Sequence, residues 1–211
     1  NCAGTCDFDQ LNISSVTNAI SINGQGDSTF SNSTISSSGR IVDLSGTGSA
    51  LFSHTSLTSS GSGISVSSAD LDIENSELDM ALSNGPALVL LGGEHTLDGL
   101  YINKTYSQSD TSSLAIDVDY ATISGSMLFT SGFATGMEIL SSSIEIDSIV
   151  LFDGEQAGIN LIHSQLNSNY LRTRVQDNGA VLDDSELTVG LWEENLHSVP
   201  LLLHEHSSAI I

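Results

Sequence analysis

The feature of this sequence that most limits its fold is a ladder of apolar residues that recurs about every 22 residues. Counted from Met137, the apolar residues follow at offsets of 2, 7, 9, 12 and 14. Blocks that start at Ile64 and at Leu88 share the offsets 2, 9 and 14, and a block that starts at Leu114 keeps 2 and 9. Self-similarity at such a period is typical of stacked supersecondary units.

Offsets in steps of two predict β-strands, because alternate side chains of a strand share one face. The step from 2 to 7 reverses the parity, so a turn must re-aim the inward face. Each block is therefore interpreted as three short strands joined by turns and closed by a loop. Pro86 and Pro200 fall at block ends, where they interrupt no strand. The same ends carry glycines, which tolerate the positive φ of tight corners: Gly63, Gly85, Gly136, Gly158 and Gly179.

A unit this short cannot bury its own apolar side, whereas stacked units can. We therefore predict an all-β parallel β-helix of about eight coils over residues 18–211, preceded by an N-terminal cap segment at 1–17. With strands about 4.8 Å apart, the rod is on the order of 40 Å long. We expect almost no helix outside the segment around Phe8–Val16.

The layout I-x-V, L-x-I and S-x-L, with glycine at coil ends, resembles the right-handed parallel β-helix repeats of the pectate-lyase-like superfamily. The resemblance covers nearly the whole chain from about Asn18. It implies a single-stranded right-handed solenoid. It leaves activity open, because that superfamily includes lyases, glycosidases, adhesins and phage fibres.

The charge of the chain is strongly negative, with 4 Lys and Arg against 26 Asp and Glu and a net charge of −22. Such a surface repels nucleic acid and anionic membranes and suits cations or basic partners. Only four acidic residues precede Asp70, namely Asp7, Asp9, Asp27 and Asp43. The Ser/Thr/Gly-rich first third has the composition of a linker or stalk. Its recurring apolar residues instead favour ordered coils with small outward side chains.

Two cysteines and three sequons favour an extracellular or cell-surface location. Cys2 and Cys6 are expected to form a disulfide at the N-terminus, with free thiols as the alternative. Asn12, Asn32 and Asn103 open N-x-S/T triplets and are candidates for N-glycosylation. The chain starts without Met and shows no signal peptide or membrane-spanning run, so we expect a processed or excised product.

Two acidic strands are candidates for binding Ca²⁺. Asp70 and Asp72 in ADLDIE, and Asp117 and Asp119 in AIDVDY, alternate with apolar residues and so face solvent together. A neighbouring coil would have to supply further oxygens, and a solvated acidic face is the alternative.

The tail offers a weak candidate for Zn²⁺, because His204 and His206 would lie on one side of a strand. No third ligand is evident in the sequence, and plain surface histidines are the alternative.

No catalytic residue is predicted. Lyases of the resembling superfamily use Ca²⁺ with a Lys or Arg base, and its glycosidases use two carboxylates. Arg172 and Arg174 share one strand face, either as an anion clamp or as charges paired with acids on adjacent coils. Asp183 and Asp184 form the best carboxylate doublet, but neighbours on a strand point to opposite faces.

We therefore expect a non-catalytic extracellular structural or adhesive module, a stalk or a filament. Its partners would be copies of itself, adjoining domains of a longer surface protein, or glycans. The apolar tail Ala209, Ile210 and Ile211 has no polar cover and is the expected association edge.

The alternative is a carbohydrate-active enzyme or a carbohydrate-binding rod, which a groove with aromatic platforms would indicate. Trp192 is expected to close the last coils rather than to form such a platform. The other aromatic candidates are Tyr101, Tyr106, Tyr120 and Tyr170.

Overall fold

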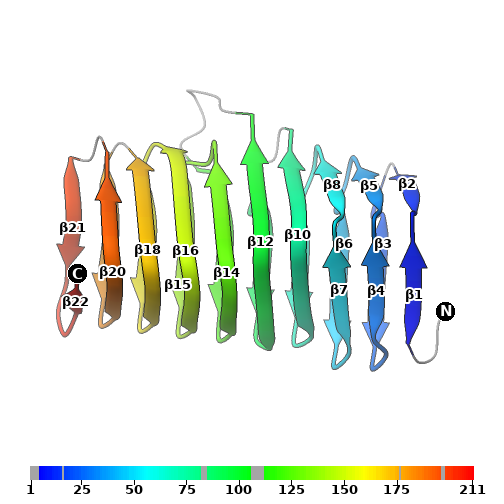
Figure 1. The fold of residues 1–211 in the computed structure, drawn as a ribbon, viewed down its shortest axis with the longest axis horizontal. Helices are drawn as coiled ribbons and strands as arrows, with labels where there is room; N and C mark the ends of the chain where they lie inside the picture. The colour runs from blue at the N-terminus through cyan, green and yellow to red at the C-terminus, as the bar shows by residue number, and fades with distance from the viewer. Residues whose placement is uncertain (1–4, 16, 82–84, 106–111, 176, 196–197) are drawn as a thin grey trace.

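The computed structural model describes residues 5–15, 17–81, 85–105, 112–175, 177–195 and 198–211. Within these ranges the chain forms strands and turns and no helix. The strands lie side by side along the longest axis, and the N- and C-termini mark opposite ends of the rod (Figure 1). No described segment is a helix that could span a membrane.

Two parallel sheets form the walls of the rod. The 13-stranded sheet contains β1 (Cys6–Asp9), β2 (Asn12–Ser15), β4 (Ser28–Ser31), β5 (Thr34–Ser37), β7 (Ser49–Ser53), β8 (Ser56–Ser59), β10 (Asp70–Met80), β12 (Glu94–Lys104), β14 (Thr122–Ser131), β16 (Ser143–Gly154), β18 (Gln165–Val175), β20 (Glu186–Glu194) and β22 (Ser208–Ile210). The 9-stranded sheet contains β3 (Ile20–Gly24), β6 (Val42–Gly46), β9 (Ile64–Ser67), β11 (Leu88–Leu91), β13 (Leu114–Asp119), β15 (Thr135–Leu140), β17 (Ala157–Ile162), β19 (Asn178–Asp183) and β21 (Val199–Leu203).

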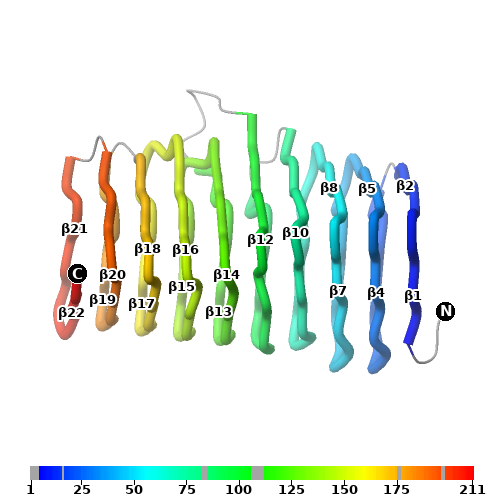
Figure 2. Tube along the Cα trace, in the orientation of Figure 1, coloured from blue at the N-terminus to red at the C-terminus, as the bar shows by residue number. Residues whose placement is uncertain are grey.

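Every coil contributes to both sheets, and each strand pairs in parallel with its equivalent in the next coil. The trace in Figure 2 passes back and forth between the two walls as it advances along the rod. In the 9-stranded sheet, for example, Ile64 pairs with Leu88, and Leu88 with Ile116. The predicted fold class is confirmed as a parallel β-solenoid, with about nine turns of about 22 residues.

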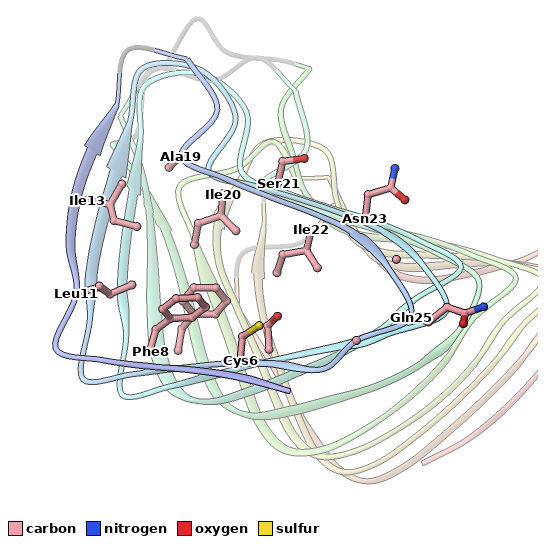
Figure 3. A pocket seen from close by; sticks show the side chains of 14 residues that line it. Cys6, Phe8, Leu11, Ile13, Ala19, Ile20, Ser21, Ile22, Asn23 and Gln25 are labelled. Atoms are coloured by element: carbon pink, nitrogen blue, oxygen red, sulfur yellow. The ribbon is translucent and has the colours of Figure 1, made fainter. Parts of the chain in front are cut away.

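The apolar ladder lines the interior as one continuous core from Ile20 to Val189. Its inward side chains alternate with outward ones, as Figure 3 shows for the first coil. There Leu11, Ile13, Ile20 and Ile22 point inward, while Ser21 and Asn23 point away. Phe8, Phe30 and Phe52 stack through this core, with ring centroids 5.0 and 4.9 Å apart.

The corners of the coils require left-handed backbone. The first corner, which follows β1, β4 and β7 and bends β10, has positive φ at Gln10, Asn32, His54 and Asn75. The second corner leads from the 9-stranded sheet back to the 13-stranded sheet. It has positive φ at Ser68, Tyr120, Ser141, His163, Asp184 and His206. Glycine would be expected at such corners. Asn, Asp and His, which occupy several of them, are several-fold enriched in this conformation.

The expected block-end glycines are needed for close approach rather than for positive φ. A Cβ at Gly158 would lie 2.5 Å from the carbonyl oxygen of Gly179, and a Cβ at Gly136 2.5 Å from that of Gly158. Real Cβ atoms essentially never come that near a backbone atom. Each glycine therefore lets one coil pack against the next.

The expectation of helix around Phe8–Val16 is wrong for the residues that the structure describes. β1 and β2 pair in register with β4 and β5, so the parallel pairing begins at Cys6 rather than at Asn18. The physical reason is that Phe8 and Ile13 keep the inward parity of Phe30 and Ile35, their partners in the next coil. Val16 lies outside the described residues.

Candidate functional site

The outer surface of the 13-stranded sheet carries a row of aromatic side chains over successive coils. Tyr101 pairs with Phe129 across β12 and β14, and their ring centroids are 5.8 Å apart. The Phe129 ring lies edge-on to the Phe152 ring at 5.7 Å, and the Arg172 guanidinium stands 5.0 Å from the Phe152 ring centroid. The Tyr101 hydroxyl reaches the Met127 sulfur at 3.6 Å. We call these five residues the aromatic face.

Strand parity explains why these side chains face outward. Leu128, Leu151 and Leu171 are fully buried, so the next residues Phe129, Phe152 and Arg172 project to the other side of the sheet. Tyr101 is 40% exposed, and Phe129 and Phe152 are half-buried because they cover one another.

Polar groups border the aromatic face on the C-terminal side. Arg172 Nε lies 3.7 Å from Glu193 Oε2, and the Tyr170 O–H donates a 2.8 Å hydrogen bond to the same oxygen. Desolvation, followed by the bond to Glu193, raises the pKa of Tyr170 above its usual value. Flat rings beside fixed hydrogen-bonding groups can stack on the apolar face of a ring-shaped ligand and hold its polar edge.

Asn103, the first residue of a sequon, lies two residues beyond Tyr101 on β12, and Glu77 pairs with Tyr101 on the N-terminal side. The Asn103 amide donates to Glu77 Oε1 at 2.9 Å. Of the other sequons, Asn12 is exposed on β2, and Asn32 stands at the first corner with its amide 2.9 Å from Asp9 Oδ1. Glycosylation of the three asparagines stays a prediction.

The first acidic pair lies where the sequence predicts, on the outer side of β10. Asp70 and Asp72 line a pocket of about 300 Å³ together with Glu94 and His95. Asp70 Oδ1 already accepts the N–H of Glu94 at 2.9 Å. His95 is a buried neighbour that sequence reasoning did not find.

The second acidic pair lies on the other sheet, so the structure does not bring the two pairs together. Burial, and then the charge of Asp119, raise the pKa of Asp117 above its usual value. Asp119 Oδ1 is buried and has no hydrogen-bond partner among the residues that the structure describes. In the part of the chain that the structure describes, no three His, Cys, Asp or Glu side chains stand ready to hold a metal. Calcium binding therefore stays a prediction.

The remaining polar candidates separate from one another. Arg172 pairs with Glu193 on the adjacent coil. Arg174, two residues further along β18, is exposed. Asp184 stands at the second corner, 3.7 Å from His163, and Asp183 ends β19. His204 and Glu205–His206 lie in the turn between β21 and β22, so the expected strand through the two histidines is wrong.

Most of the aromatic candidates from the sequence do not contribute to the face. Trp192 packs against the core and donates to Thr173 Oγ1 at 3.0 Å, as a residue that closes the last coils would. Tyr120 is 71% exposed at the second corner, and Tyr106 lies outside the described residues. Sequence reasoning did not find Phe129 and Phe152. Each directly follows an inward residue of the apolar ladder, and this position on the outward side of the strand is the signal that could have identified them.

Both ends of the described solenoid present apolar side chains. At the C-terminal end Ala209 pairs with Leu187, while Ile210 and Ile211 are 60% and 64% exposed. At the N-terminal end lies a pocket of about 860 Å³ at the end of the apolar core. It is lined by Phe8, Leu11, Ile13, Ile20 and Ile22, among others (Figure 3). Cys6 is buried beside this pocket, and Cys2 lies outside the described residues, so the disulfide stays a prediction.

No family model, no curated protein and no solved structure matches this chain. The β-solenoid architecture therefore stands on the structure itself, and the likeness to the pectate-lyase-like superfamily rests on the repeat pattern alone.

Proposed function

We propose that the chain is a non-catalytic module of an extracellular surface protein, a stiff β-solenoid whose aromatic face is adhesive. The observation that supports this is the aromatic face itself. It lies on continuous strands of one sheet, so its rings are held by the backbone register rather than by a loop. A site on such elements binds with little loss of conformational entropy.

Arg172 and the polar groups that border the aromatic face suit binding better than proton transfer. Arg172, Glu193 and Tyr170 satisfy one another through an ion pair and a hydrogen bond. A general acid or base must instead reach the proton that it transfers. These groups can orient a ligand's hydroxyls while the rings of Phe129 and Phe152 support its apolar side.

The ligand class that fits best is a neutral saccharide chain. Pyranose rings offer both an apolar face and hydroxyl edges, which match rings bordered by amide, phenol and carboxylate groups. A chain with a net charge of −22 repels polyanions, which disfavours acidic polysaccharides. The carbohydrate-active enzyme remains the alternative, because an enzyme would use the same face.

Glycan-array binding with neutral and acidic saccharides tests this proposal. We expect binding to neutral glycans that falls at least about tenfold in the Tyr101→Ala, Phe129→Ala double variant, since each lost aromatic contact is worth about 0.5–1.5 kcal/mol. Tyr120→Ala is the matched control, because Tyr120 is more exposed and lies outside the face. Circular dichroism establishes that each variant is folded.

Two results would contradict the adhesive proposal. Equal binding by the double variant and the wild type would remove the face from the function. Release of shortened or unsaturated sugars during incubation would favour the enzyme.

We also propose that β-structure covers the apolar ends, supplied either by adjoining coils of a longer chain or by second copies. Support comes from the exposed side chains of Ile210 and Ile211 and from the apolar pocket that Phe8 lines at the other end. Light scattering of the wild type and of the Ile210→Lys, Ile211→Lys variant distinguishes these sources, because edge charges oppose strand addition. Polymers that vanish in the variant indicate second copies, whereas a monomer at high concentration and high salt excludes them.

A further inference from the structure

His163, Asp184 and His206 occupy the same position in three consecutive coils. All three stand at the second corner with left-handed backbone, at φ of 50°, 45° and 58°. The N–H of His163 donates to the Asp183 carbonyl at 2.9 Å, and that of Asp184 to the Glu205 carbonyl at 3.1 Å. Each corner is therefore hydrogen-bonded directly to the next, and the three side chains form a column.

Corner geometry permits this column but does not require it. The left-handed conformation favours Asn, Asp, His or Gly, but it asks for nothing that binds a metal. In earlier coils the same corner is served by Ser68, Tyr120 and Ser141. Imidazole, carboxylate and imidazole then follow in succession, and these are donors that Zn²⁺ prefers.

The distances suit one shared ion. His163 Nε2 lies 3.7 Å from Asp184 Oδ2. Two donors at about 2.1 Å from one tetrahedral zinc stand about 3.4 Å apart, so this pair needs little movement. His206 lines the same pocket of about 270 Å³, together with Gln165 and Glu186.

His206 must turn to complete the set, because the donors do not yet surround one point in the described residues. Its corner lies one coil beyond Asp184, which places it about 10 Å from the backbone of His163 at about 4.8 Å per coil. Two imidazoles can close that span from opposite sides of an ion held over Asp184. The side chains of His163 and Asp184 are 59% and 55% exposed, and His206 is exposed, so all three are free to adjust.

We propose that this column is a Zn²⁺ site formed by His163, Asp184 and His206, with a water at the fourth position. It would act as a clip that ties three successive corners together near the C-terminal end of the rod. This ligand set differs from the His204 and His206 pair that sequence spacing suggests, because the fold stacks His206 on Asp184 and leaves His204 at the end of β21.

Zinc titration by calorimetry, with thermal unfolding alongside, tests the site. We expect one Zn²⁺ per chain above the weak background of the acidic surface, and a melting temperature that rises with Zn²⁺ but not with equal Mg²⁺. His163→Gln, Asp184→Asn and His206→Gln should each weaken binding at least tenfold. Asn suits the left-handed corner as well as Asp does, so Asp184→Asn should stay folded.

His204→Gln and His54→Gln are the matched controls. His204 lies two residues from His206 but outside the column, and His54 occupies a left-handed position at the first corner. Both should bind zinc as the wild type does. Equal loss in His204→Gln and His163→Gln, or no zinc response up to millimolar concentration in the folded wild type, would overturn the proposal.

Discussion

The first three coils and the later coils build the same wall of the rod in two ways. In the first three coils the wall is split into strands of four or five residues, such as β4 and β5. From β10 to β20 it is one strand of 9 to 12 residues per coil, such as β16. Left-handed residues divide the early strands at the first corner, whereas after Gly99 no described residue at that corner has positive φ.

Buried hydroxyls follow the same division. Ser33 and Thr55 in the early coils, and Ser76 in β10 of the next coil, stand just after the first corner, and Ser33 and Ser76 accept the N–H groups of Leu11 and Thr55. In the later coils the hydroxyl ladder moves to the second corner. There Ser142, Ser164, Ser185 and Ser207 each accept an N–H from the preceding coil.

The comparison teaches that a polar inward residue beside a left-handed corner can satisfy a backbone N–H of that corner, although Ala69 after Ser68 and Ala121 after Tyr120 show that not every such corner has one. The sharp turn leaves an N–H without a ladder partner, and burying such a group unpaired costs about 1–3 kcal/mol. A serine at that point accepts the N–H and returns its own proton to the carbonyl two residues earlier, as Ser164 does to Ile162 at 2.7 Å. Where the corner flattens, apolar residues take over.

The largest expected effect breaks the core of the early coils. Phe52→Ala removes a fully buried ring from the stack and should cost about 3–5 kcal/mol of unfolding free energy. Phe8→Ala should cost clearly less, because Phe8 ends the stack and is 37% exposed. Urea unfolding measures both, and equal losses would contradict the view that the stack is anchored inside.

The next effect tests whether the two hydroxyl ladders are equivalent. Ser164→Ala and Ser76→Ala should each cost about 1–3 kcal/mol, because each leaves a buried N–H without an acceptor. Ser143→Ala, on an exposed position of β16, should change the unfolding free energy by less than about 0.5 kcal/mol. A loss at only one ladder position would show that the corners differ in more than location.

A smaller effect concerns His95 in β12, a buried polar side chain whose register partners Leu71 and Ile123 are apolar. Its Nδ1 accepts the Leu71 N–H at 3.1 Å, so Nε2 carries the proton and donates to the Gly92 carbonyl at 2.8 Å. Burial lowers the pKa of His95, against the opposing effects of the Gly92 carbonyl and the charges of Asp70 and Asp72.

The sign of the pH dependence follows from that shift. Below the ordinary His pKa of 6.5, His95 binds a proton in the unfolded chain but not yet in the folded chain. The free energy of unfolding therefore falls as the pH drops. Above 6.5 this contribution is complete. The difference between the urea midpoints at about pH 7.5 and about pH 5 should be smaller in His95→Gln than in the wild type. An unchanged acid loss in the variant would assign the sensitivity to other groups.

The smallest effect sharpens the contrast in charge between the two regions. Ca²⁺ should raise the melting temperature beyond a NaCl control of equal ionic strength if Asp70 and Asp72 bind it, and Asp72→Asn should remove the excess. Equal shifts in Ca²⁺ and NaCl would leave only screening of the −22 charge.

The candidate site was less predictable than the fold. The outward direction of Asp70 and Asp72 followed from parity within one strand, and so did that of Arg172 and Arg174. The aromatic face did not, because Tyr101, Phe129 and Phe152 are 28 and 23 residues apart and meet only through the coil register. Because coils differ in length, these spacings are unequal, and the sequence alone does not show that the residues of the aromatic face lie together.

The sequence by itself determined that this chain is a parallel β-solenoid, because alternation of apolar residues at a repeated spacing has few other ways to bury its side chains. It also indicated core residues of the later coils, such as Ile64, Leu88 and Met137, but not the buried Phe30 and Phe52. Only the tertiary structure decided which coil residues stack, such as His206 on Asp184 rather than beside His204. It also decided where the backbone turns left-handed and which of the two corners carries the serines. The physical reason is that these features depend on the register between coils, a relation among residues about 22 positions apart that local patterning does not encode.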